Sequence, residues 1–374
     1  MVARRGHRAR RLAGGAVVRA APGRARRRGG PGGRGRERFA QQGGGVSGGT
    51  GDGPRIGVLT NPRSRHNRLA GVHALEPLLA RYPRALHRVA ASRDDIWAAL
   101  AAFAALGVDV VAINGGDGTV HTVLDGLLDR EIFDELPLLA VLPGGRTNMT
   151  ANDVGVRGGS SRRALERLLA WNGSGDASAD VTSRPVIRVE GDSDGRPRHG
   201  FFFGTAGLYQ ATVNCWAFRE ASRIPGMKTG LGTAVSIGRQ LVGHLLRRGP
   251  IAPTPIGVQF DGEARTDGEY LMLIVTTLDR MALGLRPFWD DRPAPLRFTA
   301  VAFAHRHFLR AVPALLRGKP NGVLKPEHGY SSRNAHSVVL ELASGCMLDG
   351  EIVQPRPHTP IHLTAKHTVR FLRP

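Results

Sequence analysis

Three short apolar runs, each closed by a turn sequence, constrain the fold of this chain more than any other feature. The runs span 56–60, 108–113 and 138–142, and they end in Asn-Pro, Asn-Gly-Gly and Pro-Gly-Gly. Each run precedes a helix-forming stretch, and in the second stretch apolar residues recur at helical spacing from Val120 to Leu128. Strands that alternate with helices predict a parallel sheet covered on both faces, that is, a three-layer α/β domain. Ligands bind at the carboxyl ends of such strands, where all three polar loops fall.

The pattern changes to closely spaced strands after residue 180. Residues 186–190 and 199–203 flank a Gly-Asp-Ser-Asp-Gly turn sequence, which predicts a β-hairpin. Helices are expected near 234–248 and 305–317, with Pro313 breaking or restarting the second one. Further strand-like runs are 256–260, 270–276, 296–303, 337–342, 347–353 and 367–372.

These patterns divide the chain into three parts. We expect an α/β domain over 54–180 and a β-rich sandwich domain over 181–374, whose last strand is free to return to the first domain. Residues 1–53 hold 13 Arg and two acidic residues, without any apolar period, so we expect a disordered Arg/Gly-rich segment. An organelle transit peptide, a nucleic-acid tail and a start codon placed too far upstream are all left open for it.

Composition and motifs exclude several classes of protein. Two cysteines, Cys215 and Cys346, are too few for a disulfide scaffold or a cysteine-built zinc site. The nearly apolar run 96–113 is divided by a Gly and an Asp, and a capping box begins at Ser92, so we expect a helix over 93–106 and no transmembrane segment. The P-loop sequence G-x-x-x-x-G-K-[ST] does not occur, which excludes the ordinary P-loop mechanism.

The loop GGDGT at 115–119 carries the strongest chemical signal. Its glycines permit positive φ and let backbone N–H groups approach an anion, and the following helix N-terminus adds positive potential. Asp117 is unusual beside phosphates, because a carboxylate repels them; it fits if it orients a hydroxyl or holds Mg²⁺. A tight turn in which Asp117 caps a helix is the alternative. The polar loops at 61–64 and 143–148, expected at the same sheet edge, favour the binding site.

Two Asp-Gly-Glu triplets occur later in the chain. The triplet at 349–351 falls inside the strand-like run 347–353, and its spacing of two predicts both carboxylates on one face of a strand. One carboxylate would accept the proton of a substrate hydroxyl while its neighbour orients that hydroxyl. The triplet at 261–263 follows a strand and precedes a turn sequence, so we expect it to be a solvated hairpin turn.

The order of these motifs resembles the diacylglycerol kinase catalytic-domain family. The motifs are NP-x-S at 61–64, GGDGT at 115–119, PGG-x-T-N at 143–148 and the triplet at 349–351. The family includes bacterial lipid kinases and sphingosine kinases and, more distantly, NAD kinases, and the resemblance covers 54–372. It implies an α/β nucleotide-binding domain, a β-sandwich domain with the active site between them, and transfer of the ATP γ-phosphate to a lipid hydroxyl with Mg²⁺.

The resemblance also assigns roles to single residues. Asp117 would hold Mg²⁺ and count among the catalytic residues, and Asp349 or Glu351 would act as the general base. Residues that would bind the nucleotide cofactor are Asn61, Ser64, Ser92, Gly115, Gly116, Asp117, Gly118, Thr119, Gly145, Thr147 and Asn148.

Three residues depart from the family pattern. Arg146 stands where Thr is usual, His121 where Asn is common, and Gln210 where Asp is common. These departures leave the phosphate-binding prediction intact and weaken the claim about the acceptor.

Two basic amphipathic stretches, 234–248 and 305–317, are typical of helices on anionic membranes, although helices with solvated Arg rims that cover a sheet are equally consistent. We expect a diacylglycerol or related lipid kinase of phospholipid biosynthesis. It would be cytoplasmic and peripheral at the inner membrane surface, with a membrane lipid and no nucleic acid as partner. The alternatives are a kinase for a soluble acceptor such as NAD, and a non-catalytic, nucleotide-regulated membrane-binding module. A homodimer and the lipid's identity stay open.

Overall fold

The computed structural model describes residues 53–145, 148–154, 160–174, 180–221, 251–281 and 284–373. The strands of these residues form one 15-stranded sheet, whose main path runs β14-β13-β7-β9-β8-β12-β15-β4-β3-β1-β2. The predictions for residues 1–52, for the helix over 234–248 and for Arg146 and Thr147 lie outside the described residues.

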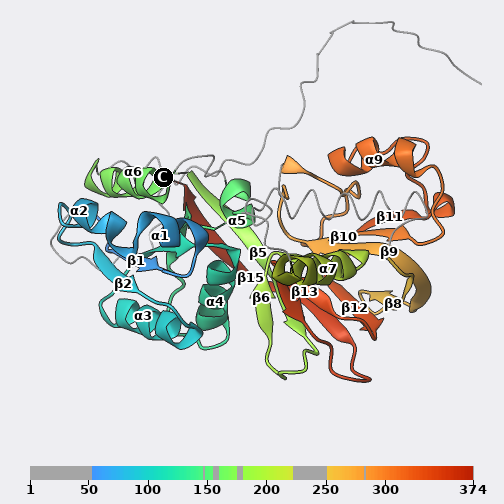
Figure 1. The fold of residues 1–374 in the computed structure, drawn as a ribbon, viewed down its shortest axis with the longest axis horizontal. Coiled ribbons are helices and arrows are strands. Elements are labelled where there is room, and N and C mark those ends of the chain that lie inside the picture. Colours follow the sequence, from blue (N-terminus) through green and yellow to red (C-terminus); the bar gives the residue numbers. More distant parts are fainter. Residues whose placement is uncertain are drawn as a thin grey trace, which may run out of the picture. The chain divides into compact units, whose positions relative to one another are not determined.

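The first region is a parallel α/β structure, as the apolar runs predict. Strands β1 (Ile56–Thr60), β3 (Val110–Gly115) and β4 (Leu138–Pro143) lie side by side in parallel, and β2 (Leu86–Val89) pairs with the far side of β1. Figure 1 shows helices on both sides of these strands, with α3 and α4 together below them. The helices are α1 (Arg65–Ala70), α2 (Glu76–Leu79), α3 (Arg93–Ala105), α4 (Asp117–Leu128), α5 (Met149–Asp153) and α6 (Ser161–Ser174), and a 3₁₀ turn spans Val72–Leu75.

The expected helix at 93–106 is confirmed as α3. Ser92 Oγ accepts a hydrogen bond from Asp95 N (3.1 Å), and Asp95 Oδ2 accepts one from Ser92 N (2.9 Å). This reciprocal capping box fixes the helix start. None of the helices that the structure describes is long and apolar enough to span a membrane.

The second region is antiparallel and β-rich. The predicted hairpin is present as β5 (Asp180–Glu190) and β6 (Arg198–Gly200). Two helices, α7 (Gly207–Ala221) and α9 (Phe308–Arg317), and a 3₁₀ turn at Pro326–His328 accompany the strands. Those strands are β7 (Phe202–Ala206), β8 (Thr254–Phe260), β9 (Thr266–Thr276), β10 (Leu296–Ala302), β11 (Tyr330–Ala335), β12 (Ser337–Leu342), β13 (Cys346–Leu348) and β14 (Glu351–Val353).

Two local predictions in this region are wrong. The α9 helix continues through Pro313 instead of breaking there. Proline removes one backbone hydrogen bond, and burial of Ala311, Ala314 and Leu315 in a hydrophobic cluster holds the helix together. The run 347–353 is not one strand but two, β13 and β14, which are joined by a turn at Asp349 and Gly350.

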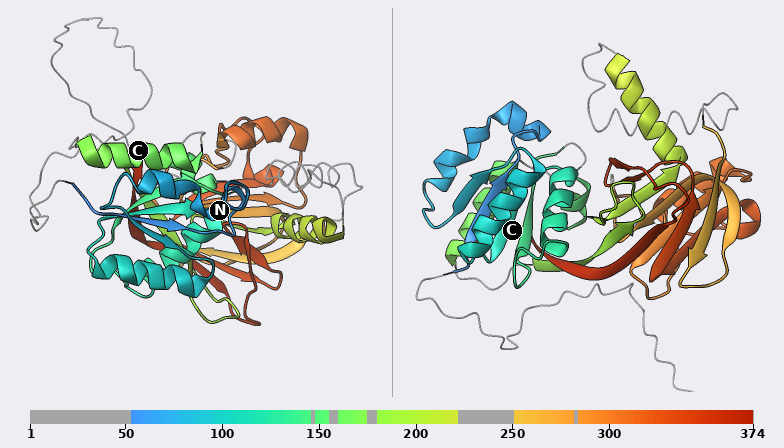
Figure 2. Two further views of the ribbon diagram at one scale, coloured as in Figure 1. Left: turned by 60° about the vertical axis from the view of Figure 1, so that its left-hand side comes forward. Right: turned by 90° about the horizontal axis from the view of Figure 1, so that it is seen from below.

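The long strand β15 (Ile361–Arg373) connects the two regions (Figure 2). It pairs antiparallel with β12 and β5, and near its end Phe371 pairs in parallel with Leu139 of β4. Ile361 and Leu363 are buried in the hydrophobic cluster of the second region, whereas Phe371 is buried in that of the first. The sheet is therefore continuous, and it fixes the loops of the first region against the turns of the second.

Candidate active site

The predicted loops meet at the carboxyl ends of β1 and β3. Asn61 Nδ2 donates a hydrogen bond to Thr119 Oγ1 (2.9 Å), and Gly116 N donates one to Ser64 Oγ (3.2 Å). Asn61 N also donates to Asn114 O (3.0 Å) at the end of β3. The side chains of Asn61 and Ser64 thus hold the GGDGT loop in place at the start of α4.

Glycines let the second and third loops touch. A Cβ atom on Gly145 would lie 2.5 Å from Gly116 Cα, and one on Gly115 would lie 2.5 Å from Thr119 Cβ. Gly116 has φ −94°, so its backbone does not use the positive φ that glycine permits. Gly116 and Gly145 are therefore required for the close approach of the two loops.

Asp117 links the GGDGT loop to helix α5. Its Oδ2 accepts a hydrogen bond from Met149 N (3.2 Å) and its Oδ1 accepts one from Thr150 N (3.1 Å). Burial raises the pKa of the Asp117 carboxyl, and these two backbone bonds oppose that rise. Asp117 therefore caps a helix, as the alternative interpretation held, but that helix is α5. The Asp117 side chain is only half-buried. One carboxylate together with water and nucleotide phosphates is a usual ligand set for Mg²⁺, so the residue fits that ion.

Two other predicted nucleotide-binding residues make local contacts. Asn148 Oδ1 accepts a hydrogen bond from Gly145 N (2.8 Å), which closes the third loop beside the second. Ser92 is not brought into this cluster by any hydrogen bond of the described residues. Its hydroxyl is used in the capping box with Asp95.

The late Asp-Gly-Glu triplet is a turn, so the prediction of two carboxylates on one strand face is wrong. Asp349 (φ +49°) and Gly350 (φ +90°) form a two-residue connection between β13 and β14, and Leu348 pairs with Glu351 across it. Asp-Gly is the dipeptide that such hairpin turns favour, because both positions need positive φ. The side-chain alternation of a strand ends where this turn begins.

The Asp349 side chain holds the turn to the backbone at the start of β7. Its carboxylate accepts hydrogen bonds from Phe201 N (3.0 Å) and Phe202 N (2.9 Å). Burial raises the pKa of Asp349 to about 7, against the lowering effect of the nearby His121 charge. A Cβ atom on Gly200 would lie 2.4 Å from Asp349 Oδ2, so glycine is required there. Both Asp349 oxygens are engaged by the backbone.

Glu351 faces the GGDGT loop. A Cβ atom on Gly118 would lie 2.9 Å from Glu351 Oε1, and the Glu351 side chain is 41% exposed. The second region thus places a partly solvated carboxylate against the first turn of α4. This juxtaposition of 115–119 with the triplet at 349–351 was expected from the motif order.

Three buried residues, His121, Asp125 and His199, form a cluster that reaches Glu351 through His121, and the sequence analysis did not predict this cluster. His121 Nε2 lies 3.3 Å from Asp125 Oδ2, and His199 Nδ1 lies 3.2 Å from Asp125 Oδ1. Burial alone would raise the pKa of Asp125, but the two histidines beside it outweigh burial and lower the pKa to about 2. The i, i+4 spacing of His121 and Asp125 on a helix was the available signal.

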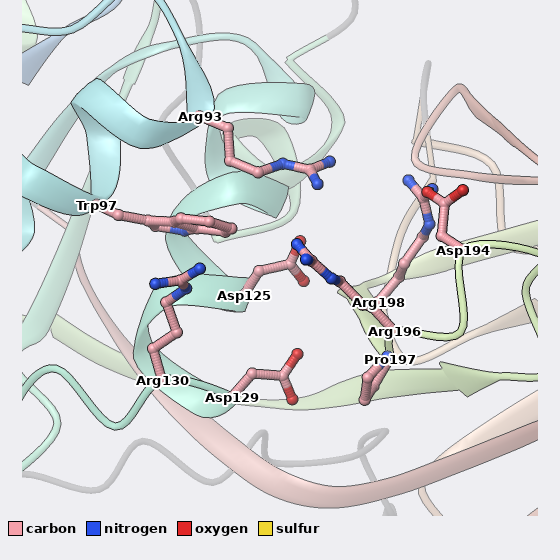
Figure 3. A pocket seen from close by; sticks show the side chains of 9 residues that line it. All are labelled: Arg93, Trp97, Asp125, Asp129, Arg130, Asp194, Arg196, Pro197 and Arg198. Atoms are coloured by element: carbon pink, nitrogen blue, oxygen red, sulfur yellow. The ribbon is translucent and has the colours of Figure 1, made fainter.

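A pocket of about 330 Å³ opens beside Asp125 (Figure 3). Asp125, Asp129 and His199 offer ligand atoms within 4.8 Å of one another. However, Asp125 is paired with two histidines, and Asp129 Oδ1 is 3.2 Å from Arg188 Nη1. We therefore interpret the group as an ion-pair network. The pocket is lined by Arg93, Trp97, Asp125, Asp129, Arg130, Asp194, Arg196, Pro197 and Arg198.

Gln210, which departs from the family pattern, supports the backbone of a neighbouring segment. Its Nε2 donates to Ala252 O (3.1 Å) and Thr254 Oγ1 (3.0 Å), and its Oε1 accepts from Ala252 N (2.9 Å). An amide side chain can make this donor-and-acceptor pairing, whereas a carboxylate cannot.

The diacylglycerol kinase catalytic-domain model matches residues 55–175. This confirms the resemblance seen in the motifs, over the stretch from β1 to α6. The match contains all three converging loops, and the Asp-Gly-Glu turn lies beyond it. A kinase, that is, a phosphotransferase, is supported. No curated protein sequence matches the chain.

Solved structures resemble this chain to different degrees. A diacylglycerol kinase from Bacillus anthracis strain Sterne is 18% identical, with a TM-score of 0.53 over 87% of this chain and 98% of that chain. A second structure from this organism, proposed to be a diacylglycerol kinase, is also 18% identical, with a TM-score of 0.58 over 88% of this chain and 98% of that chain. An NAD kinase from Archaeoglobus fulgidus in complex with ATP is 12% identical, with a TM-score of 0.42 over 84% of this chain and 92% of that chain. The Bacillus structures confirm the predicted fold class, a parallel α/β region followed by a β-rich region.

Proposed function

We propose that this chain is an ATP-dependent lipid kinase that transfers the γ-phosphate to the hydroxyl of diacylglycerol or a related lipid alcohol. One observation carries the proposal: Glu351, from the β-rich region, faces Gly118 in the loop that the α/β region presents for phosphate. A carboxylate opposite a phosphate-binding helix N-terminus is the arrangement that phosphoryl transfer to a hydroxyl needs.

The loop at 115–119 would bind the triphosphate. The N-terminus of α4 offers a positive potential, and the contacts from Asn61 and Ser64 hold it in one conformation. Asp117 would hold Mg²⁺, which supplies charge neutralisation for the phosphates when bound. Thr147 and Ser92 keep their predicted roles in nucleotide binding as part of this proposal.

Glu351 would act as the general base. It is partly solvated and reaches the loop, so it is placed to accept the proton of the acceptor hydroxyl. Asp349 suits this role less, because backbone N–H groups engage both of its oxygens. Asp349 would instead hold the turn that presents Glu351.

Helix α9 supports a lipid acceptor and peripheral membrane binding. Leu309 and Leu316 are 74% and 39% exposed, and Arg310 and Arg317 are exposed beside them. A spacing of seven places each pair on one stripe, while Ala311, Ala314 and Leu315 are buried on the other side. An exposed stripe of leucine and arginine is suited to an anionic membrane surface.

A radiolabel assay tests this function. The full chain is incubated with γ-labelled ATP and Mg²⁺, and either vesicles containing diacylglycerol or NAD is added. We expect label in the lipid fraction, abolished by chelation of the metal and strongly reduced by Asp117→Asn and Glu351→Gln. Label in NAD would support the soluble-acceptor alternative, and ATP binding without any transfer would support a non-catalytic module.

A further inference from the structure

A buried histidine stands directly behind the proposed base. His121 is fully buried on α4, and its Nε2 lies 3.3 Å from Asp125 Oδ2 and 4.0 Å from Glu351 Oε2. One ring nitrogen thus faces two carboxylates, one on its own helix and one from β14. Within the described part of the chain, neither His121 nitrogen makes an aligned hydrogen bond. The contacts therefore act through charge.

The surroundings favour the charged form of His121. Burial favours the neutral ring, but Asp125, Glu351 and Asp349 together outweigh it and raise the pKa of His121 above its ordinary value. Further charges lie around these partners. His199 from β6 lies 3.2 Å from the other Asp125 oxygen. Asp129 directly after α4, Arg198 on β6 and Asp117, which acts on Asp349, are also near.

The two oxygens of Glu351 face different neighbours. Oε2 faces the His121 ring, whereas Oε1 faces Gly118 at the phosphate loop. A cation that attracts Oε2 leaves Oε1 directed at the position where an acceptor hydroxyl would lie. Because a charged imidazole has no free lone pair, it cannot take the proton onward, so a role in orientation is favoured over one in proton relay.

We propose that His121 is a positioning residue whose imidazolium, held by Asp125, orients Glu351 toward the phosphate loop. The inference rests on the proposed function of Glu351 as base. His121 stands where the resembling family commonly has Asn, so this chain has a charge where a neutral amide is usual. His121→Asn is therefore a matched variant that removes the charge and keeps a polar side chain.

The first test does not depend on activity. The imidazole of His121 is titrated by NMR in the full chain, with its signal assigned by its loss in His121→Asn. We expect Glu351→Gln to lower the pKa of His121 by about one pH unit, because an opposite charge about 4 Å away is removed. Glu263→Gln in the early triplet is the control and leaves that pKa unchanged. An unchanged His121 pKa in Glu351→Gln overturns the proposal, whatever the acceptor is found to be.

The second test uses the pH profile of phosphate transfer. In the wild type kcat falls as pH rises through the His121 pKa, because the imidazolium is lost. His121→Asn is expected to lower kcat about tenfold, to leave KM for ATP within twofold, and to lack that fall. A variant profile that is lowered but keeps the wild-type shape assigns His121 to packing alone and overturns the proposal.

Discussion

The two Asp-Gly-Glu triplets have nearly the same backbone and opposite surroundings. In the early one Asp261 and Gly262 have φ +48° and +79°, and in the late one Asp349 and Gly350 have φ +49° and +90°. In each, the Asp carboxylate accepts backbone N–H groups of a neighbouring segment. Asp261 Oδ1 accepts from His336 N (2.9 Å) and Ser337 N (2.7 Å), as Asp349 does from two phenylalanines.

The glutamates of the two triplets differ in what lies opposite them. Glu263 is 55% exposed and forms an ion pair with Arg333 on the surface. Glu351 faces Gly118 and His121 at the start of α4. The triplet thus encodes a hairpin turn anchored by its Asp. A site arises only where the tertiary structure places a phosphate-binding helix in front of the Glu.

The largest difference is expected from neutralising each glutamate. Glu351→Gln should lower kcat by about 10²–10⁴-fold, because the variant cannot accept the proton of the acceptor hydroxyl. Glu263→Gln should leave kcat within twofold. Initial rates of labelled phosphate transfer measure both. Equal losses of kcat in the two variants would contradict a specific role of Glu351 as the base.

A methyl group should have different effects at Gly118, which faces the late turn, and at Gly262, which lies within the early turn. Gly118→Ala would place a Cβ 2.9 Å from Glu351 Oε1 and displace the carboxylate, so we expect kcat to fall about tenfold with little loss of stability. Gly262→Ala has open space around it but φ +79°, so it should cost about 1 kcal/mol of unfolding free energy and leave kcat unchanged. Denaturant titration and rate measurements on both variants separate the effects; a stable, fully active Gly118→Ala would contradict the placement of Glu351.

The last difference concerns the pH dependence of stability. The pKa of Asp349 is about 7 in the folded chain and close to its ordinary value of 3.8 when unfolded. Its contribution to stability is therefore present at low pH and lost as pH rises from about 4 to 7. Asp349→Asn should remove this part of the slope of unfolding free energy against pH, whereas Asp261→Asn keeps it. Urea titrations at pH 5 and pH 8 measure the slopes. An unchanged slope in Asp349→Asn would contradict a raised pKa of the buried Asp349 carboxyl.

Local patterns were enough to predict most of the first region. The strands, the converging loops and the α3 capping box follow from apolar runs, turn residues and the Ser92-Asp95 spacing, all of which act within a few residues. The same local logic failed at 347–353, because an apolar run hid an Asp-Gly turn signal. At Pro313, burial of the helix outweighed the intrinsic preference of proline.

The charged partners of the site could not be predicted, because their spacing along the chain is long. Asp125 and His199 are 74 residues apart, and Asp349 and Phe201 are 148 apart. No periodic pattern encodes such pairs. They arise when β6 and the β13–β14 turn are laid against α4 by the shared sheet. Ser92 shows the reverse case, because its bond with Asp95 spans three residues and can be predicted directly from the sequence.

The pairing of β15 with β4 sets an order of events during synthesis. Leu139 is made about 230 residues before its partner Phe371. At about 5–20 residues per second, the nascent α/β region waits roughly ten to fifty seconds with one edge of β4 bare. A bare strand edge is a template for wrong pairing with other chains. The free edge of β4 therefore stays open to such pairing until β15 has left the ribosome.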